Sequence, residues 1–167
     1  MRIVKPTADA LPEIYALYQL VIDDMRARGL NQWQWGRYPL EALLQEDIVQ
    51  GRLYRINDEL GLAGVFALCV GGDEPEYREV DWQLGDNPVC LHRIAVRPDR
   101  GGRGYARISV EFAKEYGRSI GCDAFRVDTY DENTRALRFF ESVTARKAGT
   151  FFLDGFDKPY HCFEISL

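Results

Sequence analysis

The residues best suited to chemistry lie in one stretch, residues 91–107, which reads LHRIAVRPDRGGRGYAR. An apolar, strand-like run is followed there by Arg97-Pro98, by a turn with three glycines and by the start of an amphipathic helix. A glycine-bearing turn that leads into a helix presents backbone N–H groups and the positive end of the helix dipole, an arrangement that binds phosphate. The stretch therefore predicts a phosphate site.

The charge around this turn is strongly positive. Five arginines fall within fifteen residues, against a single acid, Asp99. They are Arg93, Arg97, Arg100, Arg103 and Arg107. The whole chain is acidic, with a net charge of −5, so a locally cationic turn indicates a polyanionic cofactor rather than a nucleic-acid surface. An exposed loop with solvated arginines is the alternative interpretation.

Composition bounds the class of protein. A chain of 167 residues, 46 % hydrophobic and 28 % charged, is typical of one soluble globular domain with a substantial core, here residues 1–167. The sequence has no apolar run of signal-peptide or membrane-span length, so we expect a cytoplasmic protein without a membrane partner. The negative net charge argues against a nucleic-acid partner.

The cysteines and histidines give no signal for a metal. The four cysteines stand at positions 69, 90, 122 and 162, and their spacing matches neither a zinc pattern nor a CxxC pair. Three lie in apolar strand-like runs and the fourth just before one, so we expect buried, reduced thiols. Because the only histidines are His92 and His161, the sequence predicts no protein-built metal site.

Hydrophobic periodicity predicts alternating strands and helices. Strands are expected over residues 2–4, 52–56, 61–70, 89–96, 124–129, 150–153 and 160–165, and helices over residues 9–28, 39–50, 104–116 and 133–143. Asp9 is expected to cap the first helix and Gly29 to end it. This order predicts a mixed α/β (α+β) fold, with a central sheet of six to seven strands, about four flanking helices and a parallel, right-handed strand–helix–strand unit in the middle.

Two motifs in this order resemble those of the GNAT family of N-acetyltransferases. The strand LHRIAV followed by RPDRGGRGYA, residues 97–106, resembles the family's coenzyme A motif, Gln/Arg-x-x-Gly-x-Gly/Ala. Further along, NTRALRFFE, residues 133–141, resembles its second motif, Asn-x-x-Ala-x-x-Leu/Phe-Tyr-Glu. The similarity spans residues 89–145, and the two motifs together are specific.

The chain departs from the family pattern at several positions. Gly101 stands where the family has Gln or Arg, and Thr144-Ala145 replaces the usual Gly-Phe. Phe140 stands where many members have the tyrosine that protonates the leaving thiolate, and a phenylalanine has no proton to donate. A non-catalytic acyl-CoA-binding module therefore remains an alternative. A dinucleotide-binding protein fits less well, because no GxGxxG follows an early strand.

The resemblance implies an acetyl-CoA-dependent N-acetyltransferase. Its acceptor would be the primary amine of a small molecule or a peptide, which attacks directly in a ternary complex, because no motif places a cysteine as nucleophile. The diphosphate of coenzyme A would bind the backbone N–H groups of residues 102–106, the pantetheine arm would pair with residues 94–96, and Asn133 would hydrogen-bond that arm. The residues implied to contact coenzyme A are Ile94, Ala95, Val96, Arg100, Gly101, Gly102, Arg103, Gly104, Tyr105, Ala106, Asn133 and Phe140.

Acetyl transfer to an alkylamine needs a base, because the free amine is protonated at neutral pH. His92 is the first candidate, since imidazole titrates near neutral pH, and a plain hydrogen-bonded strand histidine is the alternative. Glu79 and Asp81 are rival bases in the acidic segment 71–88, unless they are merely solvated. The proton for the thiolate would come from solvent or from Tyr130.

The acceptor pocket is expected near Trp33, Trp35 and Tyr38, which lie between the first two helices, where the family builds this pocket. An aromatic wall would suit a cationic or apolar amine, and a hydrophobic plug between the helices is the alternative. The resemblance also allows a homodimer, because dimers are common in the family.

Overall fold

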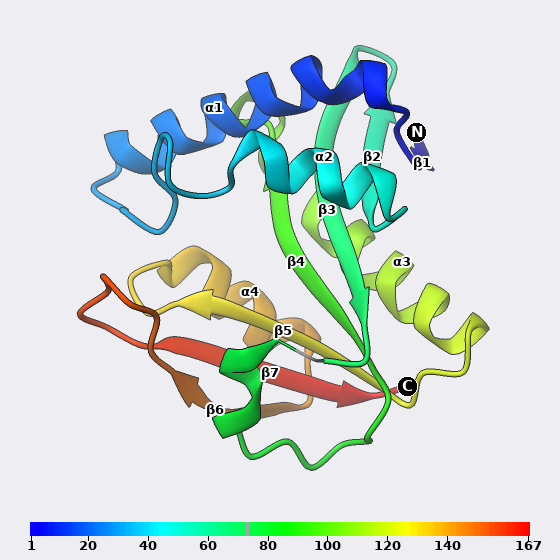
Figure 1. Ribbon diagram of the computed structural model, residues 1–167, viewed down its shortest axis with the longest axis vertical. Coiled ribbons are helices and arrows are strands. Elements are labelled where there is room, and N and C mark those ends of the chain that lie inside the picture. The colour runs from blue at the N-terminus through cyan, green and yellow to red at the C-terminus, as the bar shows by residue number, and fades with distance from the viewer. Residues whose placement is uncertain (73) are drawn as a thin grey trace. The chain divides into compact units, whose positions relative to one another are not determined.

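The computed structural model describes residues 1–72 and 74–167 and confirms the predicted mixed α/β fold (Figure 1). The strands are β1 (Arg2–Val4), β2 (Leu53–Asp58), β3 (Gly61–Val70), β4 (Pro88–Val96), β5 (Ala124–Tyr130), β6 (Arg146–Phe151) and β7 (Tyr160–Ser166). The α-helices are α1 (Leu11–Ala27), α2 (Glu41–Val49), α3 (Tyr105–Ser119) and α4 (Thr134–Val143), and the 3-10 turns are η1 (Ala8–Ala10), η2 (Pro75–Glu79) and η3 (Pro98–Arg100).

Hydrogen bonding joins the seven strands in the order β1-β2-β3-β4-β5-β7-β6. The chain divides into two compact units. Unit 1 comprises Met1–Leu68 and Arg93–Ser109, and unit 2 comprises Cys69–His92 and Val110–Leu167. The strands β3 and β4 and the helix α3 therefore contribute residues to both units. Residue 73, in the acidic segment expected over residues 71–88, lies outside the described residues.

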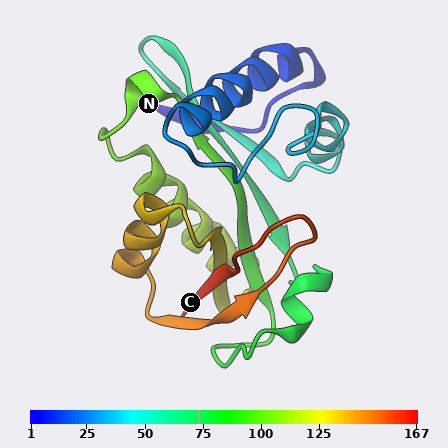
Figure 2. The ribbon, with the colours of Figure 1, turned by 90° about the vertical axis from the view of Figure 1, so that its left-hand side faces the viewer.

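Unit 1 contains α1 and α2 beside the strands β1 to β3 (Figure 2). The helix α1 buries one face at helical spacing, from Ile14 through Tyr18 to Met25, as its sequence predicted. Gly29 follows with a φ of +76°, which ends the helix as expected. The expected cap at Asp9 is wrong, because Asp9 lies inside η1 and Ala10 occupies the N-cap of α1.

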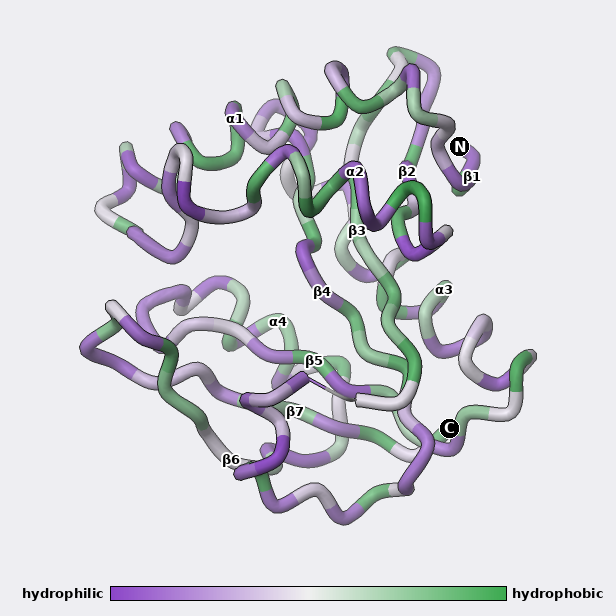
Figure 3. The backbone as a smooth tube through the Cα atoms, viewed as in Figure 1, coloured by the Kyte–Doolittle hydropathy of each residue, from purple (hydrophilic) through white to green (hydrophobic). Residues whose placement is uncertain are grey.

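The strands of unit 1 form an antiparallel meander, with Arg2 opposite Asn57 and Leu53 opposite Ala67. β3 is buried over seven consecutive residues, Leu62 to Leu68, and it is apolar along most of its length (Figure 3). A central strand covered on both faces shows this pattern. Gly64 allows a close approach, since an added Cβ would stand 2.9 Å from the carbonyl oxygen of Ala95.

Unit 2 is built on β5, which pairs in parallel with β4 and antiparallel with β7. The expected parallel strand–helix–strand unit is therefore present. Gly117 lets α3 pack tightly, because an added Cβ would stand 2.5 Å from Val89 Cγ1. β6 begins at Arg146, earlier than the expected residue 150. Its charged start is held in the sheet by an ion pair between Arg146 and the buried Glu164 of β7.

The cysteines are free thiols, and Cys90, Cys122 and Cys162 are buried as expected. Cys69 is the exception, because it is half-buried. Among the described residues, we find no helix with both the length and the apolar character that crossing a membrane would require.

Candidate functional site

A glycine-bearing loop in unit 1 leads from η3 into α3. Gly102 and Gly104 have φ angles of +76° and +84°, in the left-handed region that residues with a Cβ rarely adopt. No described atom lies within 4 Å of a Cβ built on either glycine. The two glycines are therefore needed for the left-handed backbone conformation of the turn, and they leave its outer face open.

The backbone N–H groups of this loop divide into two kinds. The N–H of Gly101 donates to the carbonyl of Pro98 at 3.2 Å, and the N–H of Ile108 donates to the carbonyl of Gly104 at 3.0 Å. Within the part of the chain that the structure describes, no acceptor is recorded for the N–H groups of residues 102–106. Four N–H groups at the start of a helix lack an intrahelical partner in any case. The loop therefore presents amides that suit an anion, although the predicted contact at Gly101 would not use its N–H.

One carboxylate of unit 1 holds both ends of this loop. Asp58, the last residue of β2, accepts a hydrogen bond from the Tyr105 hydroxyl at 2.8 Å and forms an ion pair with Arg100. The hydrogen bond from Arg100, followed by that from Tyr105, holds the pKa of Asp58 well below its usual value. Arg100 is only 7 % exposed, so its guanidinium fixes the loop. Arg103 is exposed on the loop itself.

The strand that precedes the loop is distorted at Arg93. This residue has a φ of +52° and is the only described non-glycine residue with a positive φ. Tyr18 donates a 2.6 Å hydrogen bond to the Arg93 carbonyl, and Arg93 Nε lies 2.8 Å from the buried Asp47 carboxylate. Such strain persists only where the surroundings enforce it. Sequence reasoning missed this kink, because nothing in the strand pattern distinguishes Arg93.

The predicted pantetheine-binding residues, Ile94 to Val96, follow this kink. The parallel ladder between β4 and β5 covers Pro88 to Leu91 and stops before them. Directly after these residues, the N–H of Arg97 donates a hydrogen bond to the carbonyl of Ala63, on the neighbouring strand β3, at 2.9 Å.

The three aromatic residues expected to line an acceptor pocket all lie in unit 1, but they differ in exposure. Trp33 is 8 % exposed and packs on Tyr18, with ring centroids 5.6 Å apart. Trp35 is 43 % exposed and donates a 2.9 Å hydrogen bond to Asp23. Tyr38 lies beside Trp33 and accepts a long hydrogen bond from Arg93. Trp33 thus plugs the core, while Trp35 and Tyr38 present aromatic surface.

His92 stands in a cluster of polar side chains in unit 2. Its Nε2 lies 2.9 Å from Glu74 Oε1, and its Nδ1 lies 3.7 Å from Asp128 Oδ1. Tyr77 donates a 2.6 Å hydrogen bond to Asp128, and its ring lies 5.8 Å from that of His92. Burial raises the pKa of Asp128, although the nearby His92 and Tyr77 oppose this shift. Glu74, Tyr77 and Asp128 were not predicted, because only the folding of the chain brings them to His92.

The other predicted catalytic residues do not join this cluster of His92, Glu74, Tyr77 and Asp128. Glu79 is exposed at the end of η2. Asp81 is exposed and forms an ion pair with Arg146 at 3.3 Å. The Tyr130 hydroxyl donates to Asp157 at 3.0 Å, and burial, followed by this hydrogen bond, raises the pKa of Tyr130 to about 12. A tyrosine with a pKa of that size is a poor proton donor to a thiolate.

The second sequence motif lies in unit 2 at α4. The Asn133 side-chain oxygen accepts the N–H of Ala136 at 3.2 Å and so caps the helix. Phe140 is 3 % exposed and packs on Phe139 and Phe163. Phe140 therefore occupies the apolar core of unit 2, where a hydroxyl group would need a partner.

Comparison with known proteins identifies relatives of this chain. The sequence model of the Acetyltransferase (GNAT) family matches residues 14–144. The search of curated protein sequences gave no match. Many solved structures, in contrast, share the fold.

Three of these structures illustrate the similarity. A GNAT-family acetyltransferase from Streptococcus agalactiae superposes with a TM-score of 0.84 at 21 % identity, over 99 % of this chain and 95 % of that one. The ribosomal-protein-S18-alanine N-acetyltransferase from Escherichia coli has a TM-score of 0.69 at 16 % identity, over 99 % and 92 %. The NatC complex bound to Gag peptide and CoA has a TM-score of 0.68 at 18 % identity, over 100 % and 99 %. At these identities, the structural similarity shows the fold.

Proposed function

Because this chain belongs to the Acetyltransferase (GNAT) family, we propose that it transfers the acetyl group of acetyl-CoA to a primary amine. The thioester of acetyl-CoA supplies an activated acetyl group, and the amine of a small molecule or a peptide attacks it directly in a ternary complex. One of the similar structures, the NatC complex, holds a peptide and CoA, which supports both the cofactor and the acceptor class.

The observation that carries the proposal is the loop of residues 101–104 at the start of α3. The N–H groups of residues 102–106 have no recorded acceptor within the described chain, and the N-terminus of the 15-residue α3 adds its positive end. A helix N-terminus stabilises a nearby negative charge by about 0.3–1 kcal/mol. We propose that these amides bind the diphosphate, that Arg103 supplies a charged contact, and that Arg100 acts by holding the loop.

Unit 2 supplies the proposed proton acceptor, His92. An imidazole acts as a base when one ring nitrogen is unprotonated and the other is held by a partner. Asp128, itself held by Tyr77, faces Nδ1 of His92. We propose that this carboxylate keeps the proton on Nδ1 and that the amine's proton reaches the buried Nε2 by way of Glu74, whose Oε1 lies 2.9 Å from that nitrogen.

The leaving thiolate needs no dedicated acid in this proposal. Phe140 has no proton to give, and the Tyr130 hydroxyl is bound to Asp157. A free thiol has a pKa of about 8.5, so solvent can protonate the thiolate near neutral pH.

Isothermal titration of acetyl-CoA into the purified protein tests the proposal. Gly104→Ala should weaken binding at least about tenfold, or about 1.4 kcal/mol, because the new Cβ projects from the phosphate-binding turn. Gly121→Ala is a matched control, since Gly121 has a φ of +83° and equally open surroundings but lies after α3. Both variants should lose similar stability, and only Gly104→Ala should lose affinity. A wild-type protein that ignores acetyl-CoA would rule out the proposal.

A further inference from the structure

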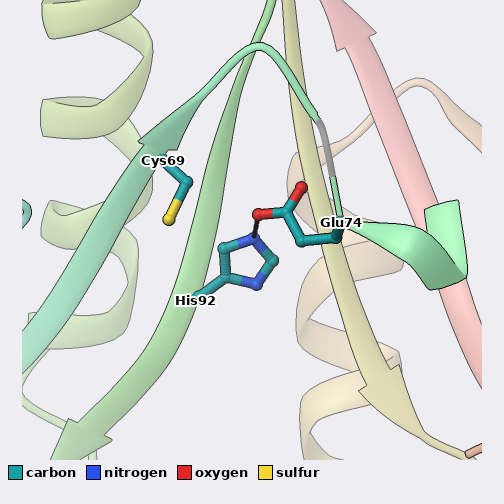
Figure 4. Close-up of side chains that lie close together, drawn as sticks. All are labelled: Cys69, Glu74 and His92. Carbon is teal, nitrogen blue, oxygen red and sulfur yellow. Dashed lines mark ion pairs between the residues drawn. The ribbon is translucent and has the colours of Figure 1, made fainter. Parts of the chain in front are cut away.

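We propose that Cys69, Glu74 and His92 form a binding site for one divalent ion of the zinc class. All three residues belong to unit 2. Cys69 lies near the end of β3, Glu74 directly precedes η2, and His92 lies on β4. Their side chains converge from these three segments (Figure 4).

The spacing of the three donor atoms fits a single ion. One sulfur, one carboxylate oxygen and one imidazole nitrogen lie within 4.8 Å of one another. In a tetrahedral zinc site, with bonds of about 2.0–2.3 Å, neighbouring ligand atoms stand about 3.3–3.7 Å apart. To hold zinc, the Cys69 sulfur would therefore move slightly closer to the other two donor atoms, and Glu74 Oε1 and His92 Nε2 would move slightly apart.

The contact between His92 and Glu74 is an ion pair when the imidazole carries a proton, and the same two atoms can be ligands of one cation when it does not (Figure 4). His92 Nε2 is buried and lies 2.9 Å from Glu74 Oε1. Nevertheless, within residues 1–72 and 74–167 this nitrogen makes no hydrogen bond. A buried polar atom in that position calls for an explanation. A cation shared by the nitrogen and the carboxylate provides one.

The surroundings of His92 match those of a metal-bound imidazole. A ligating histidine usually turns its second nitrogen toward a carboxylate, which fixes the ring and its tautomer. Asp128 Oδ1 lies 3.7 Å from His92 Nδ1 and is itself held by the Tyr77 hydroxyl at 2.6 Å. A carboxylate therefore lies near the second ring nitrogen, and at 3.7 Å the two groups would have to move closer to form the hydrogen bond of a metal-bound histidine.

The ligand types select the ion. Thiolate and imidazole favour zinc and its late transition-metal neighbours, whereas magnesium and calcium prefer oxygen alone. Three protein ligands leave one coordination position for water or another small ligand. The sequence predicted no metal site because the three residues follow no known spacing, and only the fold brings them together.

Bound zinc would also control the proposed reaction, a consequence that rests on the proposed function. The ion would occupy Nε2 of His92, the atom proposed to accept the amine's proton. One bound ion per chain would therefore stop turnover, and its removal by a chelator would restore turnover.

A cobalt titration of the metal-free, full-length chain, without acetyl-CoA, tests the site itself. We expect a thiolate-to-cobalt absorption band that saturates at one ion per chain and is abolished by one equivalent of zinc. Cys69→Ala should remove the band, and Cys122→Ala, which removes a thiol elsewhere in unit 2, should keep it. Glu74→Gln should weaken binding at least about tenfold, the loss that even an outer partner of a metal ligand causes.

Other results would overturn the site. The first is the absence of the thiolate-to-cobalt band in the wild-type protein. The second is a band that persists in Cys69→Ala, when circular dichroism shows that Cys69→Ala and Cys122→Ala are both folded. Because this titration needs no turnover, it stands even if the protein fails to acetylate any amine. Zinc binding without inhibition in an active preparation would overturn the regulatory consequence alone.

Discussion

His92 is the residue on which the proposed chemistry and the proposed metal site both depend. Its two ring nitrogens face different carboxylates, Glu74 and Asp128. A histidine in such a setting can take up a proton or a metal ion at the same nitrogen, but not both at once. A proton and a metal ion would therefore compete for Nε2 of His92.

Replacing His92 tests its role as a base. In a chelator-treated sample, His92→Gln should lower turnover by about 10²–10⁴-fold, the usual contribution of a positioned base, and leave acetyl-CoA affinity unchanged. The measurements are steady-state kinetics on an amine panel and calorimetry. His161→Gln is the matched control, because His161 also pairs with an aspartate, Asp131 at 2.7 Å, outside the proposed machinery. Equal losses in the two variants would count against His92.

Residues whose role depends on the local backbone conformation could be predicted from the sequence. Residues whose role depends on partners distant in the sequence could not. The loop glycines follow from local conformation, and Gly102 and Gly104 do adopt left-handed φ angles. The partners of His92 come from segments far apart in the sequence, and Asp128 is 36 positions away from His92. Arg93 was missed for the same reason, since Asp47 and Tyr18 of unit 1 enforce its backbone angle.

At the scale of elements, the capping residue of α4 has two separable roles. Asn133 uses its side-chain oxygen to cap the helix, and its amide N–H₂ is proposed to donate to the pantetheine arm. Asn133→Ala should cost about 1 kcal/mol of stability, the usual value of an N-cap. Asn133→Asp should keep the cap but lower acetyl-CoA affinity, because a carboxylate has no donor. Urea unfolding and calorimetry measure the two effects, and an unchanged affinity in Asn133→Asp would leave only the cap.

Most elements could be predicted because their patterns are strong over a full element. β3 is an unbroken apolar run, and α1 repeats its apolar residues at helical spacing. Errors occurred where a distant partner decides the boundary. β6 begins at the charged Arg146 because Glu164, on the neighbouring strand, pairs with it. The five-residue turn η2 was hidden in an acidic segment that reads as a loop.

At the scale of the whole molecule, the chain should become less stable in acid through Asp58. The pKa of this carboxyl is lowered in the folded state, first by Arg100 and then by Tyr105. A lowered folded-state pKa contributes stability above the unfolded value of 3.8, and this contribution is lost as the pH falls below it. Asp58→Asn should therefore lower the melting temperature at pH 7, and the difference from wild type should shrink below about pH 4.

A melting series at several pH values checks this expectation. Asp99→Asn is the surface counterpart: Asp99 pairs with Arg97 at 3.0 Å and with Arg100 at 3.6 Å, but its side chain is 56 % exposed, and exposed ion pairs contribute little. A difference between wild type and Asp58→Asn that stays constant from pH 7 to about pH 2 would contradict the linkage.

The family and the order of helices and strands along the chain could be predicted from the sequence, because two motifs and a consistent alternation of elements agree. The order of the strands within the sheet, with β7 between β5 and β6, was not predicted. The division into two compact units could not be predicted, because β3 and β4 are each continuous strands in the sequence. Pattern alone does not show that a strand contributes residues to two packing units.

The attachment of Arg100 and Tyr105 to the same carboxylate, Asp58, makes the intervening turn a closed ring without a covalent link. Such a ring has lost most of its conformational freedom before any ligand arrives, so little further entropy is lost on binding. Its length is fixed as well: an inserted residue would have to bulge outward or detach one end from Asp58. Natural relatives that lengthen this turn should therefore also change the acid at the end of the second strand.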